Sequence, residues 1–287
     1  MTPVLLDGRE LAKELKAQLT AEGAAWAAAQ GGAPALVVIQ VAGDAASDWY
    51  VRSIRRSCEG VGFGFEHRSL PAETTQADLE AAIRAACADP AISGVLVQLP
   101  LPKHLSADGA IAALDPAKDV DGLHPANAGR LAQGLAAHIP NTPAGGMALL
   151  DRYGIDPAGK HAVVVGRSNV VGKPMAQLLL ARNATVTICH SRTPNLGELV
   201  RQGDIVVAAV GRAGLITGDM LKPGCVVVDF GINEVAGGSG VVGDVDWASA
   251  SAVAGSITPV PGGTGPVTNM MLLRNTLQAA RWAAGEQ

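Results

Sequence analysis

The sequence predicts an α/β protein with two domains, in which helices connect the strands of parallel sheets. The chain has 287 residues, which is more than a single hydrophobic core usually holds. Short apolar segments bounded by glycine alternate with longer helix-forming segments, and this alternation is typical of βαβ crossovers. Apolar residues make up 48% of the chain and charged residues 17%, and there are 35 glycines, which fits a compact fold and excludes a disordered one.

The first half of the chain shows this alternation clearly. Asp7 is a suitable N-cap for a first helix, and Gly31-Gly32 ends that helix. The segment ALVVIQVAG that follows is rich in β-branched residues and bounded by glycine, as a buried strand is. The expected order is helix, strand, helix, strand, helix and strand, over residues 8–29, 35–43, 46–60, 63–70, 76–87 and 94–99.

A proline- and glycine-rich stretch, HIPNTPAGG, interrupts the alternation at residues 138–146 and marks a candidate domain boundary. After it, strands are expected over 161–168, 185–190, 204–211 and 225–233, and helices over 172–182 and 267–284. We expect the last helix to pack back on the first domain. The predicted domains are therefore residues 1–140 plus 267–287, and residues 141–266.

Composition excludes several classes of function. The formal net charge is −4, without the basic stripe that binds nucleic acid. No apolar run has the length of a membrane span, and Asp7, Arg9 and Glu10 stand where a signal peptide needs an apolar core. The cysteines have no C-x-x-C spacing and the histidines form no H-E-x-x-H pattern. We expect a soluble, cytoplasmic protein with reduced thiols, no bound metal, and no nucleic-acid or membrane partner.

The segment VVVGRSNVVGKP, residues 163–174, predicts a dinucleotide site. A strand runs into a glycine turn and then into a helix, which directs backbone N–H groups and the positive helix end toward a phosphate. The spacing differs from G-x-G-x-x-G, because Ser168 stands in place of the second glycine and the last glycine is Gly172. A purely structural turn is the alternative, but the position of the turn between a strand and a helix favours dinucleotide binding.

The end of the next strand indicates which dinucleotide is bound. NAD-binding proteins place an acidic residue there, which accepts a hydrogen bond from the ribose 2′-hydroxyl. Here the sequence is Cys189-His190-Ser191-Arg192, without an acid, and Arg167 lies in the glycine turn. A lone arginine is usually a solvated surface charge, but two arginines and a serine at one place suit a 2′-phosphate. The sequence therefore predicts NADP.

Three polar residues of the first half are unusual for simple packing. Tyr50 is on the helix after the first strand, Gln98 ends a strand, and Asp121 follows in KDVDGLHP. Taken singly, they suit a half-buried tyrosine, a strand-end amide and a turn. In a parallel sheet, however, residues just after the carboxyl ends of strands line the ligand crevice. A ring, an amide and a carboxylate together suit a flat, amide-rich heterocycle.

Taken together, the motifs resemble the bifunctional methylenetetrahydrofolate dehydrogenase/methenyltetrahydrofolate cyclohydrolase family along essentially the whole chain. They are LDGRELA, YV at 50–51, VQLPLP at 97–102, DPAKDVDGLHP at 115–125, GRSNVVGKP, DFGIN at 229–233 and TPVPGGTGP at 258–266. The resemblance implies a cleft between an N-terminal, folate-binding catalytic domain and a C-terminal Rossmann-type domain that binds NADP. It also implies a homodimer formed through the nucleotide domain, and a role in one-carbon metabolism.

The resemblance also implies roles for individual residues. Tyr50 would stack on the folate, Gln98 would lie beside the reacting centre, and Asp121 would hold the pterin. Further substrate contacts are implied for Leu99, Pro100, Gly262, Gly263 and Pro266. Cofactor contacts are implied for Thr142, Gly166, Arg167, Ser168, Val171, Gly172, His190, Ser191, Arg192, Gly211, Gly231 and Ile232.

The chain departs from the family pattern mainly on the substrate side. The family's Y-V-x-x-K is Tyr50-Val51-Arg52-Ser53-Ile54 here, so Ile54 occupies the position of the catalytic lysine. Helical spacing puts residues 50 and 54 on one face, and we expect both side chains to face the same cleft, whereas the nearby arginines point elsewhere. Further departures are Ala45, Asn141, Thr264, Val267 and Asn269.

Oxidation and hydrolysis place different demands on such a site. Removing a hydride from the methylene carbon moves no proton at the reacting atoms, so it depends on holding that carbon near the nicotinamide. Hydrolysis needs proton transfer, for which general acid–base help contributes ~10²–10⁴-fold, and isoleucine cannot supply it. We therefore expect an NADP-dependent dehydrogenase whose cyclohydrolase (hydrolase) activity is weak or absent. Three alternatives stay open: an oxidoreductase of another cyclic imine or iminium, a non-catalytic folate- or nucleotide-binding regulator, and a bifunctional enzyme with an engineered Ile54.

Overall fold

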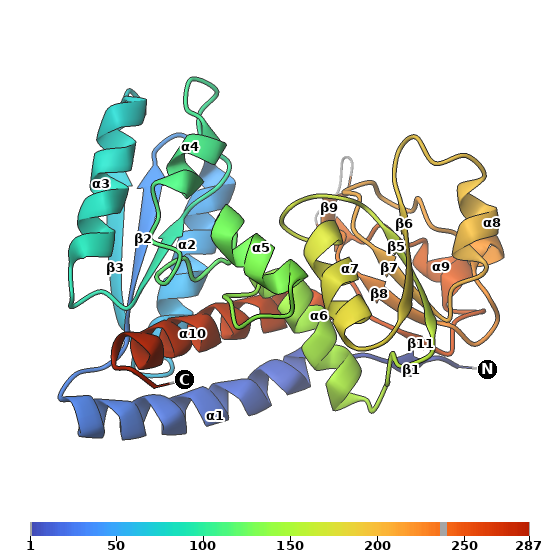
Figure 1. Ribbon diagram of the computed structural model, residues 1–287. Helices are drawn as coiled ribbons and strands as arrows, with labels where there is room; N and C mark the ends of the chain where they lie inside the picture. Colours follow the sequence, from blue (N-terminus) through green and yellow to red (C-terminus); the bar gives the residue numbers. More distant parts are fainter. Residues whose placement is uncertain (1, 236–239, 287) are drawn as a thin grey trace. The chain divides into compact units, whose positions relative to one another are not determined.

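The structure, a computed structural model, describes residues 2–235 and 240–286 and divides into two compact units. We call Met1–Ala12 with Pro140–Thr268 the six-stranded unit, and Lys13–Ile139 with Asn269–Gln287 the three-stranded unit (Figure 1). The predicted α/β class with two domains is confirmed. The N-terminal residues differ from the predicted boundary, because strand β1 (Val4–Leu5) pairs with strand β11 of the six-stranded sheet.

The six-stranded unit contains a parallel sheet in the order β1-β11-β8-β7-β5-β6. The strands after β1 are β5 (His161–Val165), β6 (Thr185–Cys189), β7 (Ile205–Ala208), β8 (Val226–Asp229) and β11 (Ser256–Ile257). The inner strands β5, β7 and β8 are rich in valine and almost wholly buried, as strands covered on both faces are. Because β6 lies on one side of β5 and β7 on the other, the strand order reverses at β5, where such sheets bind ligands.

Helices cover both faces of this sheet (Figure 1). They are α6 (Asn141–Arg152), α7 (Gly172–Ala181), α8 (Leu196–Val200), the short 3-10 helix η1 (Gly218–Met220) and α9 (Trp247–Ala250). Leu179 of α7 packs in one core with Val164 of β5, whereas Val200 of α8 packs in another core with Val163. Adjacent strand residues point to opposite faces, so these two cores lie on opposite sides of β5. A short antiparallel pair, β9 (Asn233–Glu234) and β10 (Val241–Val242), completes the unit.

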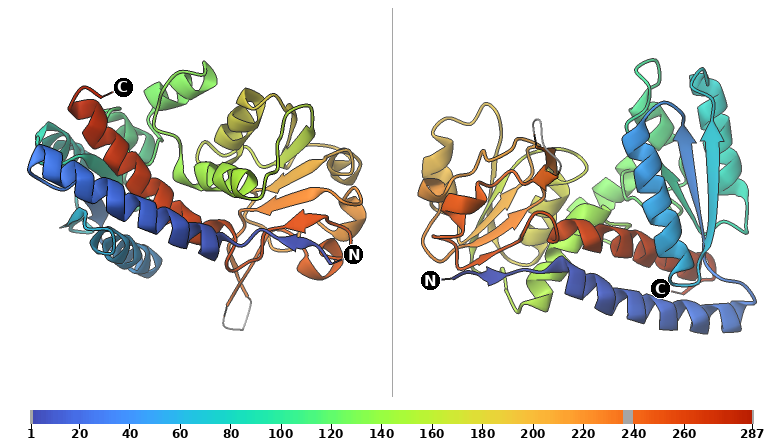
Figure 2. Two further views of the ribbon diagram at one scale, coloured as in Figure 1. Left: turned by 90° about the horizontal axis from the view of Figure 1, so that it is seen from below. Right: turned by 180° about the vertical axis from the view of Figure 1, so that it is seen from behind.

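The three-stranded unit contains a parallel sheet in the order β3-β2-β4, formed by β2 (Ala35–Val41), β3 (Gly64–Leu70) and β4 (Gly94–Val97). Its helices are α2 (Ala45–Glu59), α3 (Gln76–Ala88), α4 (Ala107–Ala112) and α5 (Pro125–Ala132), with most of α1 (Gly8–Gln30) and of α10 (Thr264–Ala283). Ile83 of α3 and Ile111 of α4 pack against Ile39 and Val97 on one face of the sheet. Figure 2 shows α2 on the opposite side of the strands from α3.

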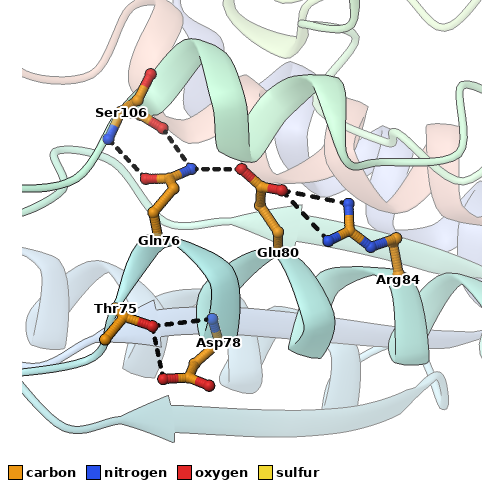
Figure 3. Close-up of polar contacts among 6 residues, drawn as sticks. All are labelled: Thr75, Gln76, Asp78, Glu80, Arg84 and Ser106. Atoms are coloured by element: carbon orange, nitrogen blue, oxygen red, sulfur yellow. Dashed lines mark hydrogen bonds and ion pairs between the residues drawn. The ribbon is translucent and has the colours of Figure 1, made fainter.

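The start of α3 is tied to the start of α4 by one side chain, Gln76 (Figure 3). The hydroxyl of Thr75 caps α3 by accepting a hydrogen bond from the N–H of Asp78 at 3.2 Å. The Gln76 amide accepts from the N–H of Ser106 at 2.8 Å, and it donates to the carboxylate of Glu80 at 2.9 Å. These contacts hold α3 and α4 together on the face of the sheet that they cover.

Most predicted elements are confirmed within two residues. The strands expected over 161–168, 204–211 and 225–233 end three or four residues earlier, at Val165, Ala208 and Asp229. The strand expected to reach Leu99 ends at Val97, and Pro100, whose nitrogen cannot donate, follows. The last helix begins at Thr264, three residues before the predicted start. The stretch expected to be irregular contains the first half of α6, because Pro143 lies in the first helical turn, where a missing N–H costs nothing. Within the part of the chain that the structure describes, no helix is long and apolar enough to cross a membrane.

Candidate functional site

The glycine turn between β5 and α7 has the shape that the sequence predicted. Gly166 has φ of +135°, and a Cβ atom there would lie 2.2 Å from the carbonyl oxygen of Ala209. A Cβ atom at Gly172 would lie 2.3 Å from the carbonyl oxygen of Gly166. Neither position can therefore hold a larger residue without moving backbone. The turn leaves the strand, folds back on itself and opens α7.

Ser168, in place of the second glycine of the pattern, has a hydrogen-bonding role within this turn. Its hydroxyl accepts from the N–H groups of Val171 at 3.0 Å and of Gly172 at 3.3 Å. From the sequence, we expect the N–H groups at the start of α7 to be available to a phosphate. Two of these N–H groups instead donate to Ser168 inside the turn. Arg167 is the exposed cation of the turn.

The predicted 2′-phosphate residues are brought together beside this turn. The N–H of Gly166 donates to the carbonyl of Cys189 at 2.9 Å, so the ends of β5 and β6 are adjacent. Arg167 follows the first of these ends, and Ser191 and Arg192 follow the second; all three are exposed. The turn after β6 is shaped by Thr193, whose hydroxyl accepts from the N–H of His190 at 2.9 Å. The sequence did not indicate this role of Thr193, because a threonine in a turn belongs to no distinctive pattern.

The other predicted cofactor residues lie at the same edge of the sheet. Gly211 follows β7, and Gly231 and Ile232 follow β8. Ile232 is 67% exposed. Thr142 is half-buried in the first turn of α6. Four neighbouring strands thus deliver predicted residues to one carboxyl edge.

In the three-stranded unit, the charge of Asp121 acts on the hydroxyl of Tyr50. Tyr50 lies on α2 and is half-buried, and Asp121 is in the loop after the isolated bridge between Val95 and Asp119. Burial raises the pKa of the Tyr50 hydroxyl, and the negative charge of Asp121 raises it further. Tyr50 therefore stays neutral at physiological pH and can stack or donate a hydrogen bond.

Gln98 is buried at the end of β4 with an unused acceptor. Its Nε2 atom donates to the carbonyl of Leu99 at 2.7 Å and lies 3.4 Å from the hydroxyl of Ser47 on α2. Its Oε1 atom has no hydrogen-bond partner among the described residues. An unpaired buried acceptor costs about 1–3 kcal/mol, so this atom is ready to accept from a ligand.

The loop that carries Asp121 is held by hydrogen bonds from amide groups that the sequence did not indicate. The buried carboxylate of Asp119 accepts from the N–H of His124 at 2.7 Å and from Nδ2 of Asn127 at 2.9 Å. The amide of Asn275 on α10 donates to the carbonyl of Val120 at 3.0 Å. The sequence signal that could have revealed the support from Asn275 was an asparagine on the buried side of an apolar helix.

Ile54 does not fulfil the expectation that it faces an open cleft beside Tyr50. Its side chain is fully buried, with 0% exposure, although the helical spacing from Tyr50 is as predicted. An isoleucine has no polar atom, and burying it contributes about 1.5–3 kcal/mol, so full burial is favourable. Arg52 and Arg56 are exposed, and Arg55 lies over the ring of Phe65 at 5.2 Å.

The remaining predicted substrate residues are divided between the units. Leu99 and Pro100 follow β4 in the three-stranded unit. Gly262, Gly263 and Pro266 belong to the six-stranded unit, where a Cβ atom at Gly263 would lie 2.7 Å from the carbonyl oxygen of Pro259. Within residues 2–235 and 240–286, no three His, Cys, Asp or Glu side chains gather as metal ligands.

Comparison with known proteins identifies the chain's relatives. It is 76% identical over 281 residues to the bifunctional protein FolD of Herpetosiphon aurantiacus, covering 98% of each chain. Its structure matches the bifunctional enzyme FolD of Campylobacter jejuni with a TM-score of 0.94 and 43% identity, over 97% of this chain and 98% of that one. It matches the Trypanosoma brucei enzyme, solved with NADP cofactor and inhibitor, with a TM-score of 0.93 and 38% identity over 98% of each chain.

Family models agree with these matches in both units. Residues 6–121 match the catalytic domain of tetrahydrofolate dehydrogenase/cyclohydrolase, and residues 140–284 match the NAD(P)-binding domain of the same enzymes. Together the two models cover most of the chain. The chain therefore belongs to the tetrahydrofolate dehydrogenase/cyclohydrolase family.

Proposed function

We propose that the protein oxidises 5,10-methylenetetrahydrofolate to 5,10-methenyltetrahydrofolate with NADP⁺, and that its cyclohydrolase activity is weak or absent. The oxidation is supported by the buried Oε1 atom of Gln98, which has no hydrogen-bond partner among the described residues. The Nε2 atom of the same side chain lies 3.4 Å from the hydroxyl of Ser47, one turn of α2 before Tyr50. The weak or absent cyclohydrolase activity is supported by the full burial of Ile54 at the position of the family's lysine. The relatives from Herpetosiphon aurantiacus and Campylobacter jejuni are called bifunctional, so the proposed lack of cyclohydrolase activity would separate this chain from them.

The residues at the carboxyl edge of the six-stranded sheet support NADP as the cofactor. Gly166 and Gly172 form a turn that a Cβ atom would obstruct, which suits the close approach of a diphosphate. Arg167, Ser191 and Arg192 are exposed and adjacent, without a nearby acid in the turn, and would hold a 2′-phosphate by charge-assisted hydrogen bonds. When bound, NADP⁺ supplies the acceptor for the hydride.

The residues of the three-stranded unit suit a folate. The ring of Tyr50 would stack on the flat heterocycle, and the carboxylate of Asp121 would accept hydrogen bonds from its amino and amide N–H groups. The Oε1 atom of Gln98 would accept a hydrogen bond at the reacting end of the substrate. These groups position the methylene carbon and transfer no proton, which is all that the oxidation requires.

Hydrolysis of the methenyl product is a different problem. A water molecule must lose a proton as it adds to the methenyl carbon, and the nitrogen that leaves must gain one. A lysine held in a partly buried site has a lowered pKa and can exchange protons near neutral pH. Ile54 has no group that exchanges protons, and the arginines beside it are exposed or lie over a ring.

We further propose that the chain forms a homodimer through the six-stranded unit. Strand β6 is the edge of its sheet and exposes 43% of Ile188, and α7 exposes 57% of Leu180. Unpaired strand edges and exposed apolar side chains favour association. Light scattering after size-exclusion chromatography tests this, since a monomer mass at micromolar concentration would contradict it.

Turnover tests the oxidation directly. Purified protein with NADP⁺ and methylenetetrahydrofolate should produce NADPH and the methenyl product together, as followed by absorbance. Protein without NADP⁺ is the control. No turnover above that control would overturn the proposal.

A further inference from the structure

A buried carboxylate, Asp244, connects the two loops that follow β7 and β8. It is 0% exposed. Its Oδ2 atom accepts from the N–H groups of Val210 at 2.6 Å and Gly211 at 2.9 Å, and its Oδ1 atom accepts from the N–H of Arg212 at 2.8 Å. Oδ1 also accepts from Nδ2 of Asn233, beyond β8, at 2.9 Å. One side chain thus fixes three successive peptide groups of one loop and the end of the other.

A second buried carboxylate, Asp229, supports the first. Its Oδ1 atom accepts from the N–H groups of Gly231 at 2.8 Å and of Asp244 at 3.0 Å, and its Oδ2 atom accepts from the N–H of Val245 at 3.0 Å. Gly231 packs directly on this arrangement, because a Cβ atom there would lie 2.5 Å from the Oδ1 atom of Asp244. The two carboxylates and the two loops therefore form one hydrogen-bonded assembly.

The position of this assembly along the sheet relates it to one half of a dinucleotide. The strand order runs β8-β7-β5-β6, and the predicted 2′-phosphate residues Ser191 and Arg192 follow β6. A dinucleotide whose 2′-phosphate lies at β6 and whose diphosphate lies at the turn after β5 continues toward β7 and β8. The loops that Asp244 holds are thus at the far end of the crevice, where the nicotinamide half would lie.

We propose that Asp244 is a positioning residue that holds the loops after β7 and β8 in the shape that receives the nicotinamide half of the cofactor. This inference rests on the proposed use of NADP. Asp244 is 0% exposed, so it would act not by direct contact but through the peptide groups of Val210–Arg212 and through Asn233. A purely structural aspartate would instead affect folding and leave the two halves of the cofactor equally bound.

Binding of two ligands separates these roles. NADP⁺ occupies both halves of the crevice, whereas adenosine 2′,5′-bisphosphate occupies only the half at β5 and β6. Asp244→Asn puts an amide NH₂ against two N–H donors and should release at least one loop. Calorimetric titration should then show a dissociation constant for NADP⁺ raised by about tenfold or more, and one for the bisphosphate changed less than about twofold.

Two further variants complete the test, one as a control and one as a substitute for Asp244→Asn. Asp204→Asn is the matched control, because Asp204 also accepts from a backbone N–H, that of His161 at 2.9 Å, but at the start of β7. It should lower the melting temperature and leave the NADP⁺ to bisphosphate affinity ratio unchanged. If Asp244→Asn does not fold, Asn233→Ala keeps the bonds from Asp244 to the first loop and removes the amide that donates to Asp244 and, at 3.3 Å, to the carbonyl of Val242. It should change the ratio in the same direction.

The possible outcomes are distinct. An unchanged NADP⁺ affinity in the Asp244 or Asn233 variant, or an equal loss for both ligands, overturns the positioning role. Wild-type protein that binds neither ligand overturns the proposed cofactor, and the inference with it. A loss confined to NADP⁺ supports both.

Discussion

The amide of Asn269 on α10 donates to the hydroxyl of Ser53 on α2 at 3.0 Å. The same amide lies 3.4 Å from the hydroxyl of Ser57, so it bridges two successive turns of α2. Ser53 directly precedes Ile54. Asn269 and Ile54, two of the positions that we expect to depart from the family pattern, belong to one packed region of the three-stranded unit. The proposed loss of cyclohydrolase activity therefore involves two neighbouring parts of the structure, and not one isolated side chain.

Ile54→Lys should restore part of the hydrolytic activity. A lysine at this buried position has a lowered pKa, which allows proton exchange near neutral pH. We expect methenyl hydrolysis about tenfold faster than that of the wild type, which is below the ~10²–10⁴-fold that a well-placed general acid–base group contributes. Loss of methenyl absorbance measures it. Ile54→Met, which keeps an apolar side chain, is the control, and equal rates in both variants would contradict the role of this position.

Arg192→Ala should reduce the preference for NADP⁺ over NAD⁺. A charge-assisted hydrogen bond contributes about 1.5–3 kcal/mol, and less at an exposed site such as this one, so we expect the ratio of kcat/KM values to fall by about tenfold. Arg201→Ala, at an exposed arginine of the same unit bonded to the carbonyl of Asp219, is the control. Equal kcat/KM values of the wild-type protein for NAD⁺ and NADP⁺ would disprove the assignment of NADP as the cofactor.

Asp121→Ala should weaken folate binding much more than NADP⁺ binding. Asp121 lies in the three-stranded unit near Tyr50, whereas the proposed cofactor residues lie in the six-stranded unit. Separate titrations with a folate analogue and with NADP⁺ compare the two affinities, and Asp108→Ala on α4 controls for the loss of an exposed charge. An unchanged folate affinity would show that the substrate site lies elsewhere.

His138 should make the protein less stable as the pH falls. Burial lowers the pKa of His138 from its ordinary value of 6.5, and its Nε2 atom lies 2.9 Å from the carbonyl of Ala117. Below pH 6.5 the unfolded chain takes up a proton that the folded chain resists, so the free energy of unfolding falls with pH until the folded histidine also titrates.

His138→Gln, which can still donate to Ala117, should show a smaller loss of stability between pH 7.5 and 5.5. Urea unfolding at the two pH values measures the difference, and His104→Gln is the control for the loss of a histidine. A variant slope as steep as that of the wild type would contradict the prediction.

Local patterns predicted most of the fold, because strand and helix periodicity depends on neighbouring residues. They could not predict β1, since a two-residue strand has no periodicity and pairs with Ser256 and Ile257 from the other end of the chain. They placed Tyr50 and Ile54 on one helix face but could not say how deeply each is buried, because burial depends on what packs against that face.

The candidate site was predictable to the same extent. Exposed or glycine positions that follow strands, such as Arg167 and Gly211, could be named from the sequence. Buried supports such as Asp244 could not, because the peptide groups that Asp244 holds lie more than thirty residues earlier in the chain. The hydroxyl of Ser168 was likewise noticed only as a departure from the glycine pattern, whereas it holds the turn together.

The activity that we propose is oxidation of the methylene substrate without hydrolysis of the product. Stopped-flow absorbance of the wild-type protein with methylenetetrahydrofolate and NADP⁺ tests it most directly, since methenyl product and NADPH absorb at different wavelengths. We expect the methenyl product to accumulate in step with NADPH and to disappear only at the rate measured in buffer alone. Brisk hydrolysis above the buffer rate, with NADPH formed but little methenyl product, would show that another residue supplies the proton and would contradict the role given to Ile54.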